Sequence, residues 1–574
     1  MLKFLFALAA MALPAFATPT PESCGRLLEG GRLTYRAEAA HHSLDGYTQG
    51  DLSLNRLIYP TMGEIQTPLG KLRLQWLLAH PYTDRTEILR RQQAVQELMG
   101  NEERREAVAR ELAFLAQALG SSRGQVSWER YGLDIGDPQS FYSYFEDSRT
   151  PPSKNVGIFT GAMTAASLVV MTTVVATGRW ELSATPLAPW MALSNLAGDN
   201  MRRSRLLRAR LRADSAVFGS LERLAQSLNG VQSPALQELA SVLGLMADQS
   251  SERGVSGLAQ RLHAVTPRSR WTAAGDFFFG RSAWQGLIEL ESEVLSAETA
   301  ARLQHILGAV AELDVFRAFA QDAVEHEGHK VFPLILEQET PTITIDAGHN
   351  PVVFERRGEA SVANSATITH ESNFFVLTGA NMGGKSTYLK MVAALTVQAQ
   401  IGATVTARAM ALTPVELMTN IDISDSIGEG KSFFDAETNR IMEVIEHAQK
   451  SGRMLVIMDE ILLGTNPQER AAAEEAIIQY LQRTGNLFLL DTHDLGMARL
   501  EGVVPGLSNI HVEEHFVNGR MKFSYQVMPG PSPSRNAIRV LEMKNFPQEI
   551  TEAAWEYLQR NAAEPTPEDP ENMR

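Results

Sequence analysis

Apolar residues recur at three- and four-residue spacing through two long parts of the chain, residues 57–146 and 201–324. This spacing brings apolar side chains to one face of a helix, and few runs in these parts alternate as strands do. We therefore predict a helical domain, which we place at residues 57–340 after a lead-in of residues 21–56.

The pattern changes near Pro341, where short segments rich in β-branched residues begin. The segments PTITIDAG, VVFERR and NFFVLTG each end at glycine or at charged residues, as strands do. Strand-like and helix-like segments then alternate to about residue 527, which predicts a mixed α/β domain at residues 341–527. The fold class is therefore multidomain, with α and α/β parts.

A break in this pattern at Pro529-Gly530-Pro531 marks the end of the α/β domain. Two short helical patterns follow, and we assign residues 528–560 to a helical C-terminal element. The remaining residues, 561–574, are rich in Pro and Glu and are predicted to be disordered.

Length and composition agree with a folded protein of several domains. The chain has 574 residues, which is too long for a single hydrophobic core. Its net charge of −15 argues against coating nucleic acid with the whole surface, although a local basic groove is still compatible with it. The single cysteine, Cys24, excludes an intramolecular disulfide and a zinc site built from several thiolates of one chain.

The N-terminal residues 1–20 resemble a secretory signal. Lys3 precedes an apolar run, and Ala15-Phe16-Ala17 has the small residues of a cleavage site. The alternatives are an uncleaved anchor or an N-terminal helix, because the run is short for a membrane span.

A second apolar feature is the uncharged stretch of residues 156–198, interrupted only near residue 180. Its two parts are compatible with a membrane hairpin or with buried helices. Basic residues lie on both sides, at Arg149 and Lys154 and in an arginine-rich segment from Arg202 to Arg212, so both flanks would face the cytoplasm. A solvated helix face or a phosphate-binding face are the other interpretations of the arginine-rich segment.

A phosphate-binding loop is predicted between a buried strand at residues 374–378 and a helix. The glycines let successive backbone N–H groups point at phosphate oxygens, Lys385 reaches the β- and γ-phosphates, and Ser386 offers a hydroxyl to Mg²⁺. The predicted nucleotide contacts are Gly379, Ala380, Asn381, Met382, Gly383, Gly384, Lys385, Ser386 and Thr387.

Two further strands end in residues suited to ATP hydrolysis. Residues 455–458 lead to Asp459, a predicted Mg²⁺ ligand, and to Glu460, which would orient or deprotonate water. Residues 487–490 lead to a segment that contains His493, where a histidine could sense the γ-phosphate. The ordinary alternatives are a solvated strand end for the acids and a structural role for the histidine.

The segments TGANMGGKSTYLK, AQIGATVTA, DEILLGTNPQERAAAEEAI and DTHDLGMARL resemble the MutS family of DNA mismatch-repair ATPases in order and spacing. The resemblance implies a helical core and lever domain, a P-loop ATPase domain of ABC type, a C-terminal dimerisation element, and ATP and Mg²⁺ as cofactors. It also implies that Ser432 contacts the nucleotide of the partner in a homodimer, and that Asn364 belongs to the segment shaping the adenine pocket. The chain departs from the family at Phe433, where threonine is usual.

The family's mismatch-reading domain, with its Phe-x-Glu wedge, has no counterpart in this sequence. The resemblance is therefore to a branch without that domain, with residues 156–198 where the family inserts its DNA clamp. We expect an ATP-dependent DNA-binding protein that changes conformation on DNA, in mismatch repair or related processing of DNA structures. The alternative is a membrane-associated ATPase that acts on a protein or membrane partner. A working ATPase needs cytoplasmic ATP, so we expect it to face the cytoplasm, with inner-membrane attachment left open.

Overall fold

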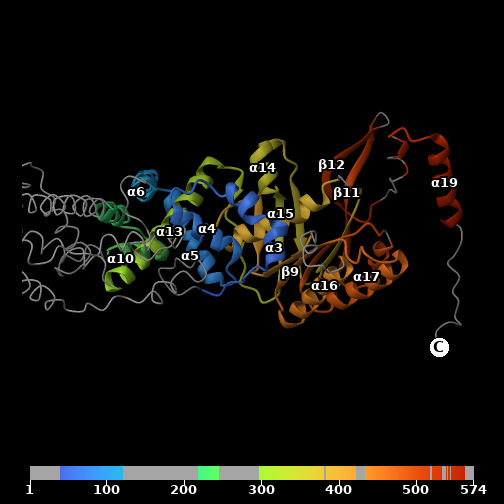
Figure 1. Cartoon of the computed structure of the whole chain (residues 1–574), viewed down its shortest axis with the longest axis horizontal. Coiled ribbons are helices and arrows are strands. Elements are labelled where there is room, and N and C mark those ends of the chain that lie inside the picture. The colour runs from blue at the N-terminus through green and yellow to red at the C-terminus, as the bar shows by residue number, and fades with distance from the viewer. Residues whose placement is uncertain are drawn as a thin grey trace, which may run out of the picture. The chain divides into compact units, whose positions relative to one another are not determined.

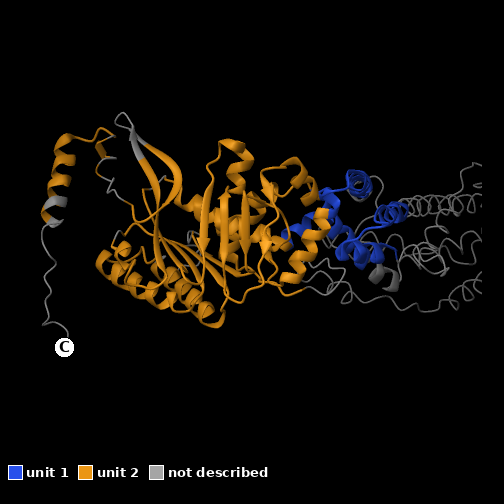
Figure 2. Ribbon diagram, turned by 180° about the vertical axis from the view of Figure 1, so that it is seen from behind, with its two compact units in different colours: residues 1–37, 65–76, 97–317 blue, residues 38–64, 77–96, 318–574 orange. Residues whose placement is uncertain are grey.

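A computed structural model describes residues 39–120, 217–244, 297–380, 383–421, 433–494, 496–517, 520–532, 538, 541–542 and 544–562. The chain divides into two compact units (Figure 2). One comprises residues 1–37, 65–76 and 97–317, and the other residues 38–64, 77–96 and 318–574. Four sequence features lie outside the described residues: the signal-like segment 1–20, the uncharged stretch 156–198 with its basic flanks, and residues 563–574.

The helical pattern in the first half of the chain is confirmed wherever that half is described (Figure 1). None of the described helices is long and apolar enough to cross a bilayer. The helices are α3 (Gly46–Leu52), α4 (Pro68–Ala79), α5 (Arg85–Met99), α6 (Glu102–Gly120), α10 (Pro234–Gly244) and α13 (Ala297–Glu325), with short turns η1 (Leu54–Ile58) and η2 (Tyr59–Thr61).

Buried polar contacts organise the first unit. Arg73 of α4 donates to Glu312 of α13 at 2.6 Å, and both side chains are buried. Asp314 accepts from the Thr67 backbone N–H and from its hydroxyl, at 2.7 Å each. Burial raises the pKa of Asp314, although these hydrogen bonds oppose the rise. Because the partners come from distant parts of the sequence, these contacts fix how α4 and α13 pack.

The second unit contains a six-stranded sheet in the order β12-β11-β5-β10-β9-β8. All neighbouring strands are parallel except β12, which pairs antiparallel with β11. The carboxyl ends of β5, β10 and β9 therefore meet at one edge of the sheet. The strands are β5 (Phe374–Thr378), β8 (Glu416–Asn420), β9 (Met454–Asp459), β10 (Leu487–Asp491), β11 (Leu507–Val517) and β12 (Arg520–Pro529).

Two smaller sheets complete this unit. One has four strands in the order β2-β7-β3-β4, and the other pairs β1 with β6. The strands are β1 (Lys330–Val331), β2 (Leu334–Ile335), β3 (Ile343–Gly348), β4 (Asn364–Ile368), β6 (Val405–Thr406) and β7 (Ala409–Leu412). From residue 351 onward the helices are α14 (Pro351–Arg357), α15 (Lys385–Gln400), α16 (Phe433–Lys450), α17 (Pro467–Gln482) and α19 (Gln548–Ala562), with η5 (Gly358–Ala360) and η7 (Met497–Leu500).

The segment VVFERR is a helix, α14, and our prediction of a strand there was wrong. The Asn350 side chain accepts from the backbone N–H groups of Val352 and Val353, and Pro351 occupies the first helical turn. An Asn cap followed by proline is a strong start signal for a helix, and here it outweighs the strand preference of two adjacent valines.

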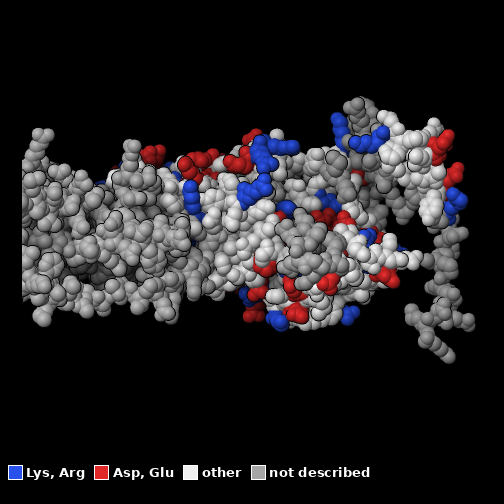
Figure 3. All heavy atoms as spheres, in the orientation of Figure 1, with Lys and Arg blue, Asp and Glu red and all other residues white. Residues whose placement is uncertain are grey.

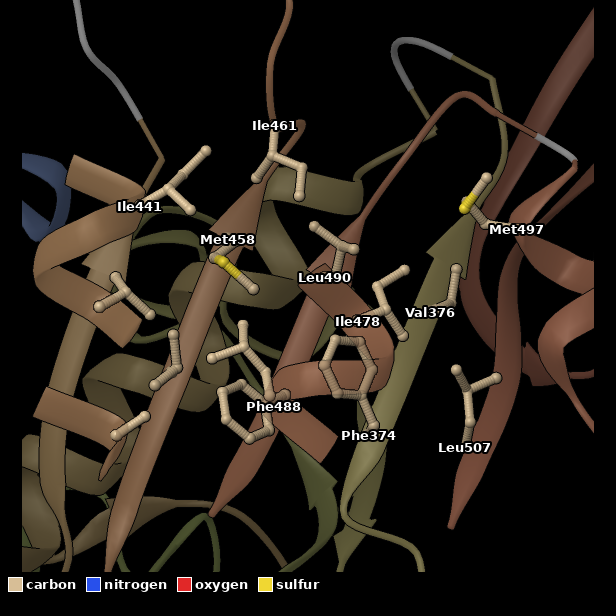
Figure 4. Close-up of a cluster of buried hydrophobic side chains, with 14 of the residues drawn as sticks. Phe374, Val376, Ile441, Met458, Ile461, Ile478, Phe488, Leu490, Met497 and Leu507 are labelled. Carbon is tan, nitrogen blue, oxygen red and sulfur yellow. The ribbon is translucent and has the colours of Figure 1, made fainter. Parts of the chain in front are cut away.

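The core of the large sheet lies under α16 and α17 (Figure 4). Phe374 of β5 stacks on Phe488 of β10, with ring centroids 5.1 Å apart. Ile441 of α16 and Ile478 of α17 are buried in the same cluster. This apolar packing holds β5, β9 and β10 rigidly, so the residues at their carboxyl ends have fixed positions.

Helix α15 is buried on all sides from Met391 to Gln400, whereas Ser386 and Thr387 in its first turn are exposed. At its C-terminal end, Arg91 donates to the Ile401 carbonyl at 2.7 Å. Gly402 follows with φ 82°, and a Cβ there would lie 2.5 Å from the Arg91 Cβ. A cation on the last carbonyls favours the helix dipole, and the close approach of Arg91 requires glycine at this turn.

Candidate nucleotide site

A glycine-rich loop joins β5 to α15 at the carboxyl edge of the large sheet. Gly379 has φ 141° and Gly384 has φ 96°, backbone conformations that favour glycine. A Cβ on Gly383 would lie 3.1 Å from the Ala380 carbonyl oxygen, and one on Gly384 would lie 3.2 Å from the Tyr525 ring. The loop thus leads directly into α15, whose first N–H groups have no partner within the helix and favour an anion.

The Lys385 side chain is folded back across this loop. Its Nζ donates to the Gly379 carbonyl at 3.0 Å, and it lies 3.3 Å from the His493 Nε2. The Asp491 Oδ1 is 3.6 Å from the same nitrogen. Lys385 is buried, so its charge has these groups rather than water around it.

Ser386 and Asp459, the two predicted Mg²⁺ ligands, are in contact. The Ser386 hydroxyl donates to the Asp459 Oδ2 at 2.8 Å. Hydroxyl and carboxylate oxygens are ligands that Mg²⁺ accepts, and with a nucleotide this ion takes most of its other ligands from phosphates and water. The pair therefore fits such an ion. Among the described residues, no group of three or more His, Cys, Asp or Glu side chains could hold a metal by itself.

Glu460 adopts an uncommon backbone conformation next to Asp459. Its φ is 48°, in the left-handed region that glycine usually occupies. The backbone N–H donates to the Asp491 carbonyl at 2.9 Å, which holds this conformation in place. The Glu460 Oε1 lies 3.2 Å from the His493 Nε2. Strain of this kind, locked by a hydrogen bond, is common at functional sites.

His493 therefore lies between a cation and an anion. Burial, helped by the nearby charge of Lys385, lowers the pKa of His493, while Glu460 and Asp459 oppose the change. The ring is thus neutral at physiological pH, and its Nε2 either accepts from Lys385 or donates to Glu460, according to which ring nitrogen carries the proton.

A cavity of about 590 Å³ opens over these residues. The predicted contacts Ala380, Gly384, Lys385, Ser386, Thr387, Asn364, Asp459 and Glu460 line it. Gly379 and Gly383 shape the loop, whereas Asn381, Met382 and Ser432 lie outside the described residues. Asn364 holds the wall of the cavity, because its amide donates to the Tyr525 carbonyl and its oxygen accepts from the Val527 N–H.

Sequence reasoning missed several residues of this cavity. Asn350, Arg356 and Arg357 of the α14 region line it together with Tyr525. It also missed Asp491, which ends β10 as Asp459 ends β9, and this equivalent position was a signal available in the sequence. The α14 residues were not considered as part of the site, because that segment was assigned to a strand.

Glu474 of α17 is a second acid that the sequence did not single out. It is buried, and its Oε1 has no hydrogen-bond partner. Burial raises the pKa of Glu474 to about 7, and the neighbouring charges of Asp494 and Glu460 add to the rise. A hydrogen bond from the Thr492 side chain and the charge of Arg470 oppose it. Glu474 thus lies beneath the segment that carries His493.

Comparison with known proteins gives a family for the C-terminal part. Residues 375–561 match the family model described as MutS domain V. The chain is 34% identical over 266 residues to the DNA mismatch repair protein MutS of Lactobacillus delbrueckii subsp. bulgaricus, covering 46% of this chain and 30% of that protein. It is 34% identical over 277 residues to the protein of the same name from Geobacillus kaustophilus, with 46% and 30% covered. The matched region thus spans about 30% of the length of these relatives.

Proposed function

We infer that this chain, which is similar to MutS proteins and whose residues 375–561 match the family model of MutS domain V, is a Mg²⁺-dependent ATPase that changes conformation on DNA. The observation that carries the proposal is that Lys385, Ser386, Asp459 and Glu460 line one cavity, with His493 in contact with Lys385 and Glu460. A regular glycine turn would not need these five side chains together.

The roles of the residues follow from their positions. Lys385, released from the Gly379 carbonyl, would bind phosphate oxygens together with the backbone N–H groups of the loop. Ser386 and Asp459 would hold Mg²⁺, and the ion, when bound, neutralises charge on the phosphates. Glu460 would orient the attacking water and take its proton. Neutral His493 contacts both Glu460 and Lys385 and would hold their side chains in position.

The domain limits are part of the same proposal. Residues 341–527 would be a P-loop ATPase domain of ABC type, residues 57–340 the lever domain, and residues 528–560 the dimerisation element. In support, Ile550 and Tyr557 of α19 lie seven positions apart, on one helix face, and are 49% and 65% exposed. An exposed apolar helix face of this kind suits association with a second copy.

DNA as the partner rests on what the relatives are named, DNA mismatch repair proteins. On the face shown in Figure 3, the described Lys and Arg side chains are interspersed with Asp and Glu. We therefore expect phosphate contacts at local sites rather than along one continuous basic stripe. The membrane-associated alternative depends on residues 1–20 and 156–198, which lie outside the described residues, and no observation favours it.

Two variants test the ATPase assignment. Lys385→Ala should abolish nucleotide binding in calorimetry, because it removes the cation that contacts the phosphates. Glu460→Gln should bind ATP yet hydrolyse it at least about a hundredfold more slowly, which is the usual effect of losing a general base. Normal turnover by both variants would overturn the assignment.

DNA binding is tested separately. The wild-type protein should bind duplex or branched DNA with an affinity that falls steeply as salt rises, since each phosphate contact releases counterions. Absence of binding to either DNA at low salt would remove DNA from the proposal and leave the ATPase assignment intact.

A further inference from the structure

Two aspartates lie side by side at the carboxyl edge of the large sheet. Asp491 is the last residue of β10 and Asp459 is the last residue of β9, and the two are register partners in the parallel pair. Both line the cavity together with Ser386 and Lys385. The predicted Mg²⁺ end of the cavity thus has two carboxylates in equivalent positions, of which only Asp459 has a role so far.

Asp491 is the more deeply buried of the two, with only 1% of its surface exposed. Its Oδ1 makes no hydrogen bond. The nearest cation is the Lys385 Nζ at 3.6 Å, which is beyond hydrogen-bond length. Burial raises the pKa of Asp491, and the neighbouring Asp459 adds to this rise.

An unsatisfied carboxyl oxygen in such a place is costly. A buried polar atom without a partner destabilises the fold by about 1–3 kcal/mol, and more when it is charged. An apolar residue would fill this strand end without that cost. Asp491 lines the cavity in which the nucleotide is proposed to bind, so a ligand of that cavity is the partner that would satisfy this oxygen once Lys385 has turned to the phosphates.

We propose that Asp491 is a second carboxylate for the Mg²⁺ that accompanies the nucleotide, acting beside Asp459 and Ser386. This inference rests on the proposed function. Mg²⁺ prefers oxygen ligands and keeps several waters, so one or two carboxylates beside the phosphates suit it. Asp491 contacts the ion directly or through one of those waters, and in either case it raises the affinity for the metal.

The approach of Asp491 to Lys385 has a second explanation, in which the aspartate only holds the lysine in place until a nucleotide binds. The two explanations differ in what removal of the carboxylate does. Loss of a metal ligand raises the Mg²⁺ concentration needed for nucleotide binding. Loss of a lysine contact instead strengthens nucleotide binding at every Mg²⁺ concentration, because Lys385 is then free to meet the phosphates.

The experiment is a Mg²⁺ titration of fluorescent ADP binding, with the full-length protein and its Asp491→Asn and Asp491→Glu variants. Asn has the same shape but no charge, and Glu restores the carboxylate. For Asp491→Asn we expect the Mg²⁺ midpoint to rise about tenfold or more, in line with the loss of a residue that supports a metal site. Asp491→Glu should recover part of this shift. Thermal melting establishes that each variant is folded, and Asp491→Ala replaces any that is not.

Asp494→Asn is the matched control. It removes a negative charge from the same segment, and the Asn oxygen can still accept from the Gly496 N–H, as the Asp494 Oδ1 does at 2.7 Å. Its midpoint should equal that of the wild-type protein. An unchanged midpoint in Asp491→Asn and Asp491→Ala, or tighter nucleotide binding at all Mg²⁺ concentrations, would overturn the inference. Failure of the wild-type protein itself to bind ADP would instead overturn the proposed function.

Discussion

The unfolding free energy of Glu474→Gln, compared with that of the wild type at the same pH, should be more favourable at alkaline pH than at acidic pH. Burial raises the pKa of Glu474 from 4.5 to about 7 in the folded protein. Between these two values the unfolded chain releases the proton and the folded chain keeps it. The free energy of unfolding of the wild-type protein therefore falls as the pH rises from about 4.5 to about 7, and this group lowers it no further above that pH.

The size of the effect follows from the same shift. One pKa unit corresponds to about 1.4 kcal/mol, so the wild-type protein should lose up to about 3 kcal/mol of stability from this one carboxyl. Gln cannot ionise, and it can still bond the Thr492 side chain. The difference in unfolding free energy, variant minus wild type, should therefore grow by about 2–3 kcal/mol between pH 5 and pH 8.5.

Urea denaturation of both proteins at five pH values across this range measures the difference, because other titrating groups are common to the two proteins and cancel. Glu475→Gln is the matched control: Glu475 is the next residue of α17, only partly buried, and accepts from the Gln479 side chain at 3.1 Å. This variant measures what removal of a partly exposed carboxylate from the same helix does to the stability. If the Glu474→Gln difference did not change with pH, the interpretation of Glu474 as a buried, neutral carboxyl would be refuted.

Three further outcomes are expected. Gly402→Ala should lower the melting temperature, at a cost of about 1–3 kcal/mol, because alanine resists φ 82° and its Cβ overlaps Arg91; a melting curve equal to the wild type would contradict this. Arg73→Met should cost about 3–5 kcal/mol in urea unfolding because it removes the arginine from the buried Glu312, and adding Glu312→Leu should recover most of the loss. The ATPase rate should fall on the acid side at a pH below 6.5, where His493 becomes protonated, and His493→Asn should lack this step in its pH profile.

The strands that carry the site could be predicted because they are buried on both faces. Such strands appear in the sequence as continuous apolar runs, and β5, β9 and β10 all have this form. Parallel strands bring their carboxyl ends to one edge, so the residues that follow these three runs gather at that edge.

The buried acids could not be found in the same way. Glu474 is one of two adjacent glutamates in an alanine-rich helix, and its sequence neighbours do not tell which of the two is buried. Its burial depends on packing between elements distant in the sequence. The lack of a hydrogen-bond partner for the Asp491 Oδ1 depends on such packing too. In α14 the competing signals were local, and the cap at Asn350 decided between them.

The contact between Arg91 and the end of α15 has a mechanical consequence. The helix begins at the glycine-rich loop and has sixteen residues, so it is a stiff segment about 24 Å long. Arg91 belongs to α5 and is hydrogen-bonded to the carbonyl at the opposite end. A displacement of the loop along the helix axis would therefore displace α5 as well. Movement at the phosphate-binding end of α15 would thus be transmitted to a helix at its opposite end.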